Sequence, residues 1–476
     1  MHKSFLLNFA CLALFICFIA SSNQHLWCQS PNTLSSAERL YGVSKFWQEV
    51  NYNFVFLDKV NRHQWDSLYK ETLLRCQETA SDYEYYLLLQ KLCASLKDGH
   101  TNVYFPNEVA KNLYTTNFGA YRFFVSYFEG RYLITRVNES KKEEIPVGSE
   151  IVEVNGLPAA TYAQKYVKPY ISSSTDYVLE SQAAYDLLKG YIGSKFTIQI
   201  KKPDGTLKTL KLEHQVTQEK EVFPPFVNRA LLDHKVMEHG IHYLALNSFE
   251  NEKIDSFFHD VLPQLYKAKA MIIDLRYNGG GSTNIGFDIL QYFTNAKSLA
   301  GSKSLTREHM PAFKAWGAFL TPADTMAAKP EWDSSKDEMV KSYLMAHDQF
   351  YYTFPYEETK VKVKGKRIVV PTVVLMGNAT ASAAEDFLIY ADPLPHFTFM
   401  GDKSFGSTGQ PYLFDLPGGG RARVCTKKDV YPDGREFVGY GISPDIFVKP
   451  TLDEYLQDKD VVLQKAMEFL GGKLQK

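Results

Sequence analysis

The chain has 476 residues, of which 45% are hydrophobic and 14% are aromatic. This composition excludes a disordered chain, and the length allows two or three folded domains. The formal net charge is -1 at pH 7, and the basic residues are scattered along the sequence. We therefore expect neither a nucleic acid nor an anionic membrane surface as a partner.

Residues 1–28 predict a secretory signal peptide. A basic start precedes an apolar run from Phe5 to Ala20, and small residues follow it, which is the layout of an export signal. The run is shorter than the ~20 residues that a membrane span needs. We expect an exported protein, periplasmic, cell-envelope or extracellular, with no integral membrane span after signal removal. A surface-anchored protein would need a lipidated Cys28, which the preceding Trp27 disfavours.

Residues 29–106 predict a helical segment. Apolar residues recur every three or four positions in ERLYGVSKFWQEV and in DYEYYLLLQKLCASL, the spacing of one helix face. The pattern stops at Asp98-Gly99, a turn sequence after which alternation begins. Cys76 and Cys93 could form a disulfide or remain buried thiols, and the sequence leaves both alternatives open.

Residues 107–215 predict a β-rich domain. Alternating stretches such as YRFFVSYFEGRYLITRV lead to two strands joined through Pro203-Asp204-Gly205, a hairpin signal. The unit VGSEIVEVNG, followed by a helix in QAAYDLLKGYIG and by the hairpin, resembles a PDZ domain. The resemblance implies capture of an extended peptide by strand addition, and a β-rich spacer without a ligand is the alternative.

Residues 216–460 predict an α/β core, because strands and helices alternate from IHYLALNSF onward. Between about 297 and 366 this periodicity gives way to polar, aromatic and proline-containing sequence, which we interpret as an insertion or lid. Residues 461–476 predict a C-terminal helix or tail. The expected fold class is α/β, within a multi-domain α+β chain.

Several motifs of other chemistries are absent or incomplete. GGGSTN follows a strand but fits neither phosphate-binding glycine pattern, G-x-x-x-x-G-K-[ST] or G-x-G-x-x-G. SLYK matches S-x-x-K without its companion motifs, and G-x-S-x-G is missing. The three histidines of DHKVMEHGIHY lack the HExxH spacing of a zinc site. We expect no metal ion and no cofactor.

The stretch GNATASAAEDF, residues 377–387, follows the β-branched run RIVVPTVVLM. Such an order predicts a strand, a tight turn and the start of a helix, with Ser382 at the turn. The serine could cap the helix through its side chain. It could equally be a nucleophile at the end of a strand, where the helix N-terminus favours developing negative charge.

Five motifs together resemble the tail-specific, or C-terminal processing, serine peptidase family, which includes the tricorn core peptidase. They occur in the order LKDGHTNVYF, MIIDLRYNGGG, VVLMGNATASAAEDF, GDKSFGSTGQ and VGYGISPDIFV. The resemblance covers nearly the whole chain after the signal, with the PDZ-like segment in the expected place. It implies a protease core of the ClpP/crotonase-like type and hydrolysis of a polypeptide substrate.

The resemblance implies that Ser382 is the nucleophile. It also implies an oxyanion hole formed by the backbone N–H of Ala383 and a glycine of Gly279 and Gly280. The processing branch of the family takes its base from a lysine in a G-K-G motif. Here Ser407 stands in that motif, so a Ser–Lys pair is disfavoured.

The tricorn branch of the family uses a histidine as base instead, and Asp98-Gly99-His100-Thr101 matches its motif. An imidazole can take the serine proton near neutral pH, so His100 is the predicted base. The carboxylate that orients this histidine in the tricorn branch has no counterpart in register, and Glu436 is the closest acid. Asp433 and Glu385 are weaker candidates.

Asp274 and Arg276 are expected to support the active-site loops through hydrogen bonds. These residues together predict an exported serine endopeptidase that works through a Ser382 acyl-enzyme. The alternative is a catalytically inactive protein that binds a peptide or an apolar ligand on the same fold.

Overall fold

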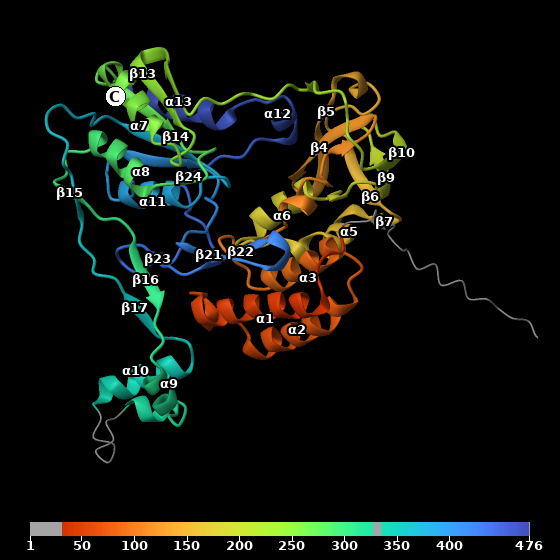
Figure 1. The fold of residues 1–476 in the computed structure, drawn as a ribbon. Coiled ribbons are helices and arrows are strands. Elements are labelled where there is room, and N and C mark those ends of the chain that lie inside the picture. Colours follow the sequence, from red (N-terminus) through yellow and green to blue (C-terminus); the bar gives the residue numbers. More distant parts are fainter. Residues whose placement is uncertain (1–30, 327–334, 476) are drawn as a thin grey trace, which may run out of the picture.

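The computed structural model describes residues 31–326 and 335–475. The predicted signal peptide and Cys28 therefore lie outside the described residues. Within the described ranges, no helix is long and apolar enough to cross a membrane. Figure 1 shows a helical segment at the N-terminal end, a β-rich domain, a mixed core and an arm that projects from the core.

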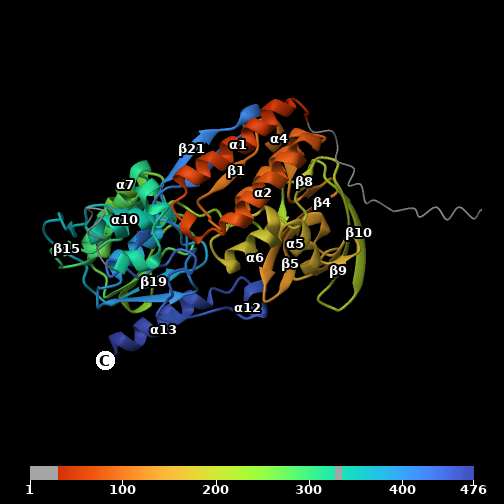
Figure 2. The same cartoon turned by 90° about the horizontal axis from the view of Figure 1, so that it is seen from below.

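The helical segment consists of α1 (Ser36–Asn53), α2 (Arg62–Arg75) and α3 (Asp82–Ala94), which confirms the predicted helical spacing. The segment packs on two partners: α1 contacts the core strand β22 (Arg421–Cys425), and α3 contacts the β-rich domain (Figure 2). Cys76 and Cys93, like Cys425, are buried free thiols, so the disulfide alternative is excluded.

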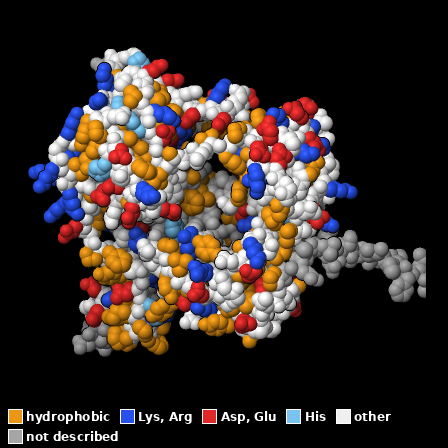
Figure 3. Space-filling view, turned by 45° about the horizontal axis from the view of Figure 1, so that its top comes forward, with side chains coloured by type: hydrophobic (Ala, Val, Ile, Leu, Met, Phe, Trp, Pro, Cys, Tyr) orange, Lys and Arg blue, Asp and Glu red, His pale blue; other side chains and the backbone are white. Residues whose placement is uncertain are grey.

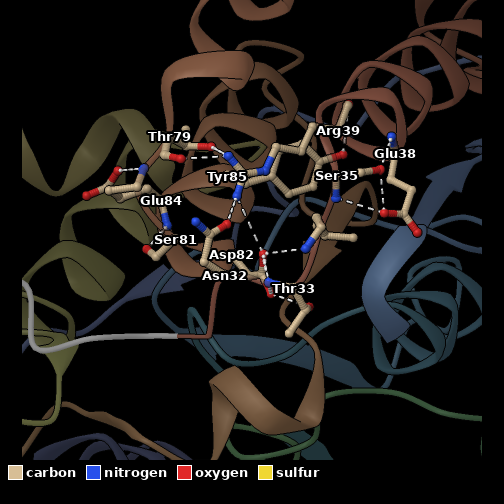
Figure 4. Close-up of polar contacts among 12 residues, drawn as sticks. Asn32, Thr33, Ser35, Glu38, Arg39, Thr79, Ser81, Asp82, Glu84 and Tyr85 are labelled. Atoms are coloured by element: carbon tan, nitrogen blue, oxygen red, sulfur yellow. Dashed lines mark hydrogen bonds and ion pairs between the residues drawn. The ribbon is translucent and has the colours of Figure 1, made fainter.

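A buried polar cluster fastens the start of α1 to α3 (Figure 4). The Arg39 guanidinium donates to Thr79 and lies 3.8 Å from the Asp82 carboxylate. The same carboxylate accepts hydrogen bonds from Thr33. Since a buried charge is costly unless it is paired and hydrogen-bonded, these contacts fix how the chain enters the first helix.

The β-rich domain is built on one main sheet with the strand order β10-β9-β6-β5-β4-β3, in which β3 is Asn117–Phe118. The predicted hairpin is present, because β9 and β10 pair antiparallel around the Pro203-Asp204-Gly205 turn. The predicted helix over QAAYDLLKGYIG is only partly right: α6 ends at Tyr185, and Gly190 instead pairs with the strand β2 (Leu113–Tyr114). The main elements are β4 (Tyr121–Phe128), β5 (Arg131–Asn138), β6 (Glu150–Val154), α5 (Ala159–Tyr166), α6 (Asp176–Tyr185), β9 (Lys195–Lys201) and β10 (Leu207–Glu213).

The core contains a six-stranded sheet in the order β12-β13-β14-β19-β20-β24, in which all neighbours except β12 and β13 are parallel. Because β14 and β19 are parallel neighbours, the loops that follow them meet at the same edge, where ligands bind in such sheets. The elements are β12 (Leu232–Val236), β13 (Ile241–Leu246), α7 (Lys253–Leu265), β14 (Ala270–Asp274), α8 (Thr283–Leu290), β19 (Thr372–Met376), α11 (Ala383–Ala391), β20 (Phe397–Gly401), β24 (Ile446–Phe447) and α13 (Val461–Leu474).

The predicted insertion forms the projecting arm at the bottom of Figure 1. Its short strands β16 (Lys303–Arg307) and β17 (Tyr351–Thr353) pair with each other and lead to the helices α9 (Pro311–Gly317) and α10 (Lys336–Ala346). The strand β16 also pairs with β23 (Lys428–Val430) of the core. The arm is therefore anchored to the core by strand pairing.

We expect Phe258→Ala to lower the free energy of unfolding by about 3–5 kcal/mol. Phe258 on α7 is fully buried in the core, so its removal leaves a cavity. The neighbouring Phe257 is 43% exposed, and Phe257→Ala is expected to change stability by no more than about 0.5 kcal/mol. Urea unfolding of both variants measures the difference, and equal losses would contradict the packing described.

Candidate active site

Ser382 occupies the turn between β19 and α11. It stands at the N-cap position of α11 with φ of +54°, a region that residues other than glycine rarely adopt. The residues on either side, Ala381 and Ala383, are buried. Such strain persists only where the surroundings enforce it and gathers at functional sites, so the backbone here differs from that of an ordinary serine cap.

The glycine loop after β14 lies against this turn. Gly280 has φ of +102°, and a Cβ atom on it would lie 2.7 Å from the Ser382 Cβ and 3.1 Å from the Ala383 nitrogen. The loop is fixed by Asn278, whose carbonyl accepts from the Ala381 N–H and whose side chain accepts from the Gly280 N–H. The two loops therefore meet in a defined register.

Two backbone N–H groups near Ser382 form no hydrogen bond within the described residues and could donate to a ligand. Among the hydrogen bonds of the described residues, none uses the N–H of Ala383 or that of Gly279. Ala383 is the first residue of α11, where the N–H groups have no partner within the helix. Since the Gly280 N–H is already bonded to Asn278, Gly279 is the glycine of the predicted pair that keeps a free donor.

His100 reaches the site from the helical segment. The strand that follows it, β1 (Asn102–Tyr104), pairs antiparallel with β22 and so joins the core. The His100 Nδ1 lies 2.7 Å from the Ser407 Oγ. Burial, with a further contribution from the Arg423 cation, lowers the pKa of His100 to about 4. The imidazole is therefore neutral at pH 7, as a general base must be.

Glu385 connects the loops of Ser382 and Ser407. It lies fully buried on the first turn of α11, and one carboxylate oxygen accepts from the N–H of Ser382 at 3.0 Å and of Ser407 at 3.3 Å. The other oxygen accepts from the Ser404 hydroxyl and the Gly406 N–H. The sequence interpretation treated Glu385 as an acid at the helix start, and its one signal was the S-x-x-E spacing of a capping box.

The structure does not bring Glu436 to His100. The Glu436 carboxylate pairs with Lys59 at 3.0 Å and with Lys428, and both contacts lie at the surface. The weaker candidate Asp433 accepts hydrogen bonds from Arg435 and, among the described residues, forms none with His100. The group that contacts the His100 Nδ1 is the Ser407 hydroxyl, so the predicted orienting role of Glu436 is corrected here.

Asp274 is the last residue of β14, and Arg276 follows it two residues later, before the glycine loop. Their side chains form an ion pair at 2.6 Å, and Arg276 extends to the Asp460 carboxylate, also at 2.6 Å. Asp460 caps α13 by accepting from the Leu463 N–H. The pair thus ties the end of β14 to the C-terminal helix, and its support of the active-site loops stays a prediction.

A cavity of about 1290 Å³ opens beside the His100 loop. It lies between α3, β1 and the helices of the PDZ-like domain, and Gly99 and Phe405 border it on the side of the catalytic candidates. This volume has room for an extended polypeptide segment. Figure 3 shows that the molecule is also hollowed between the core and the PDZ-like domain.

We expect Gly280→Ala to lower the rate of peptide hydrolysis by about 100-fold, the cost of a displacement of roughly 1 Å at a reacting group. The new Cβ would overlap the Ser382 Cβ and the Ala381 carbonyl, and the positive φ adds strain. Gly377→Ala is the control, because a Cβ there meets no atom within 4 Å. Equal rates for the two variants would contradict the close contact of the loops.

Comparisons with known proteins agree with the predicted domains and with the fold. Residues 240–448 match peptidase family S41, and residues 122–222 match a PDZ domain. The chain is 21% identical over 450 residues to carboxyl-terminal-processing peptidase 3, chloroplastic, of Arabidopsis thaliana, a match that covers 88% of this chain and 73% of that protein. It is 22% identical over 451 residues to the carboxyl-terminal-processing protease of Synechocystis sp., covering 93% and 89%.

The fold has a counterpart among solved structures. Mature CPAF in complex with lactacystin aligns with a TM-score of 0.61 at 15% sequence identity, over 91% of this chain and 98% of that chain. The PDZ domain, the core and the order of the two agree with the predicted family. Residues 240–448 are accordingly an S41 serine peptidase core, and the chain is similar to C-terminal processing peptidases over most of its length.

Proposed function

We propose that the protein is an exported serine endopeptidase in which Ser382 is the nucleophile and His100 the general base. The observation that carries the proposal is the strained Ser382 turn beside two unbonded backbone N–H groups. A peptide carbonyl placed at Ser382 would find both donors near the position where its oxygen becomes negative. Such preorganised donors are worth about 100- to 1000-fold in rate each.

The acylation step follows from the contacts of His100. Donation from His100 Nδ1–H to Ser407 Oγ leaves Nε2 free to accept the Ser382 hydroxyl proton. The Ser382 oxygen then attacks the peptide carbon, and the oxyanion is held by the Ala383 and Gly279 N–H groups. When the C–N bond breaks, Nε2–H returns its proton to the leaving amine, and the acyl-enzyme remains on Ser382.

Deacylation repeats the same steps with water. His100 Nε2 takes a proton from a water molecule, which attacks the acyl carbon, and then gives that proton to the Ser382 oxygen. The orienting role of a carboxylate in a triad passes in this proposal to Ser407. Neither lysine nor metal chemistry is needed for this sequence.

The proposed base is tested by His100→Ala. Cleavage of an unfolded protein by the purified wild type, with loss of at least about 1000-fold in the variant, would support the assignment. Lys403→Ala is the matched control, because Lys403 is the lysine nearest in sequence to Ser407, which stands where the processing branch has its lysine. If Lys403→Ala abolished cleavage and His100→Ala did not, the histidine assignment would be wrong.

Export is proposed from the sequence of residues 1–28, with its basic start and apolar run. Fractionation of cells that express the full chain, together with the mass of the mature N-terminus, tests it. Removal of the apolar run from an extracytoplasmic product supports export. An intact N-terminus in the cytoplasmic fraction contradicts it, and an added lipid at Cys28 would indicate anchoring.

A further inference from the structure

The cavity beside His100 has an unbalanced charge. Its wall contains four cationic side chains and one carboxylate, that of Asp186. Two of the cations have partners: Lys189 lies 3.3 Å from Asp186, and Lys195 lies 3.6 Å from Glu213. The other two, Lys165 and Arg423, form no ion pair with any carboxylate of residues 31–326 and 335–475.

Arg423 is the cation closest to the catalytic candidates. It lies on β22 opposite Asn102 of β1, and its Nε donates to the Asn102 Oδ1 at 2.8 Å. One terminal nitrogen lies 3.5 Å from the carbonyl of Gly99, the residue before His100. The second terminal nitrogen has no hydrogen bond among the described residues. The guanidinium is therefore held in place and keeps free donors.

The buried acid Asp98, on the turn that Arg423 contacts, forms no ion pair with Arg423 among the described residues. The Asp98 carboxylate is fully buried, accepts from the Thr101 hydroxyl at 2.6 Å and lies close to the Ser174 hydroxyl. It thus belongs to the turn that carries His100 and forms no ion pair with the guanidinium. A cation that is fixed by neutral partners and borders a cavity is suited to a carboxylate from outside, because Arg–carboxylate contacts are strong and directional.

The wall also contains aromatic side chains, which would accept an apolar neighbour of that carboxylate. Aromatic side chains from three parts of the chain line the cavity, and the Tyr104 ring lies 5.8 Å from the Arg423 guanidinium carbon. They include Tyr83, Tyr104, Phe105, Tyr162, Tyr170 and Phe405. Rings of this kind pack against apolar side chains and leave the charge of a ligand to Arg423.

We propose that this cavity is a substrate subsite for a carboxylate-bearing peptide segment and that Arg423 is its specificity-determining residue. The inference rests on the proposed peptidase function and names its substrate class. The carboxylate is that of a Glu or Asp side chain near the scissile bond or that of the substrate's C-terminus. Both sources offer the same group to the guanidinium.

Matched peptides distinguish the two sources. Starting from one peptide that the wild type cleaves, each position within three residues of the cleaved bond is varied as Glu, Gln and Lys, with the C-terminus free or amidated. We expect kcat/KM to be about 10-fold higher for the Glu peptide than for the Gln peptide at one position, the scale of one charge-assisted contact. A preference for the free over the amidated C-terminus would instead assign the C-terminal carboxylate.

Charge changes at Arg423 test the residue itself. Arg423→Gln should bring the Glu-to-Gln ratio close to one, and Arg423→Glu should favour the Lys peptide. Arg421→Gln is the control, since Arg421 lies on the same strand with an exposed side chain that pairs with Asp415, and it should keep the wild-type ratio. Should Arg423→Gln fold poorly, the reversed preference of Arg423→Glu still carries the test.

Equal wild-type rates for all peptides, or a carboxylate preference that survives in both Arg423 variants, would overturn the subsite. Cleavage of the Gln peptide by the wild type establishes peptidase activity independently of this site. Failure of the subsite is therefore distinguishable from failure of the proposed function.

Discussion

Ser382→Ala is expected to lower kcat/KM for peptide hydrolysis by about 10,000-fold or more, the scale of removing a catalytic serine. The residue is held with φ of +54° beside Gly280, at the edge of the sheet where the loops after β14 and β19 meet. Alanine keeps the backbone constraint and removes only the hydroxyl. The measurement is the rate of cleavage of an unfolded protein by equal amounts of each enzyme.

The same substitution should leave the fold intact. Alanine and serine have similar freedom at this backbone position, so we expect the free energies of unfolding to agree within about 1 kcal/mol. Ser382→Gly provides a second readout, because glycine relieves the positive φ and should be at least as stable as the alanine variant. Cleavage by Ser382→Ala at the wild-type rate would remove the basis for an acyl-enzyme on Ser382.

Glu385→Gln is expected to lower kcat by about 100-fold, with little change in KM. The Glu385 carboxylate accepts four hydrogen bonds, two from the loop of Ser404 and Gly406 and one each from Ser382 and Ser407. A glutamine amide offers one acceptor oxygen and turns its NH2 group toward two donors. The loops of Ser382 and Ser407 should then shift relative to each other, and shifts of roughly 1 Å cost about this factor.

The pH profile separates this positioning role from simple loss of structure. Burial, opposed by the hydrogen bond from Ser404 and by those from backbone N–H groups, raises the pKa of Glu385 to about 7. The ionised form accepts all four bonds, so kcat of the wild type should rise through pH 7. The pKa of His100, about 4, places its own titration well below this limb. Glu385→Gln should lack the limb.

The matched control for this variant is Glu454→Gln. Glu454 holds the same position in the capping box of α12 (Leu452–Leu456), but it is only partly buried, and its carboxylate bonds Thr451 rather than the loops of Ser382 and Ser407. It should retain the wild-type kcat and pH limb. Persistence of the limb near pH 7 in Glu385→Gln would contradict the assignment to Glu385.

The free energy of unfolding of the wild type should fall as the pH rises, whereas its kcat should rise. The pKa of Glu385 is about 7 in the folded chain, above its ordinary value of 4.5. A raised carboxyl pKa contributes stability that is fully present below pH 4.5 and is lost as the pH rises through 7. The wild type should thus lose about 3 kcal/mol between pH 4.5 and pH 8 relative to Glu385→Gln, at 1.36 kcal/mol per pKa unit.

Much of the fold could be predicted from local patterns. The helical spacing before Leu96 and the buried strands β14 and β19 are strong periodic signals, and they appear where expected. The end of α6 was missed because Gly190 pairs with a strand distant in sequence, and such pairing outweighs helical spacing. The sequence did not predict the arm helices α9 and α10, because apolar residues recur there only weakly at helical spacing.

For the candidate site, sequence motifs indicated residues but not the contacts between them. The sequence indicated Ser382, His100 and Ser407 through motifs, and the structure brings their loops together through Glu385. The prediction of Glu436 rests only on its distance along the chain from a family motif. Its partner Lys59 is 377 residues away, and only the folded chain reveals that contact.

A label on the nucleophile tests the central claim most directly. The protein is incubated with a fluorophosphonate probe, and the modified residue is located by mass spectrometry of its peptides. We predict one label per chain on Ser382, no label in Ser382→Ala, and strongly slowed labelling in His100→Ala. An unlabelled wild type that is folded, or a label on another residue, would contradict the account.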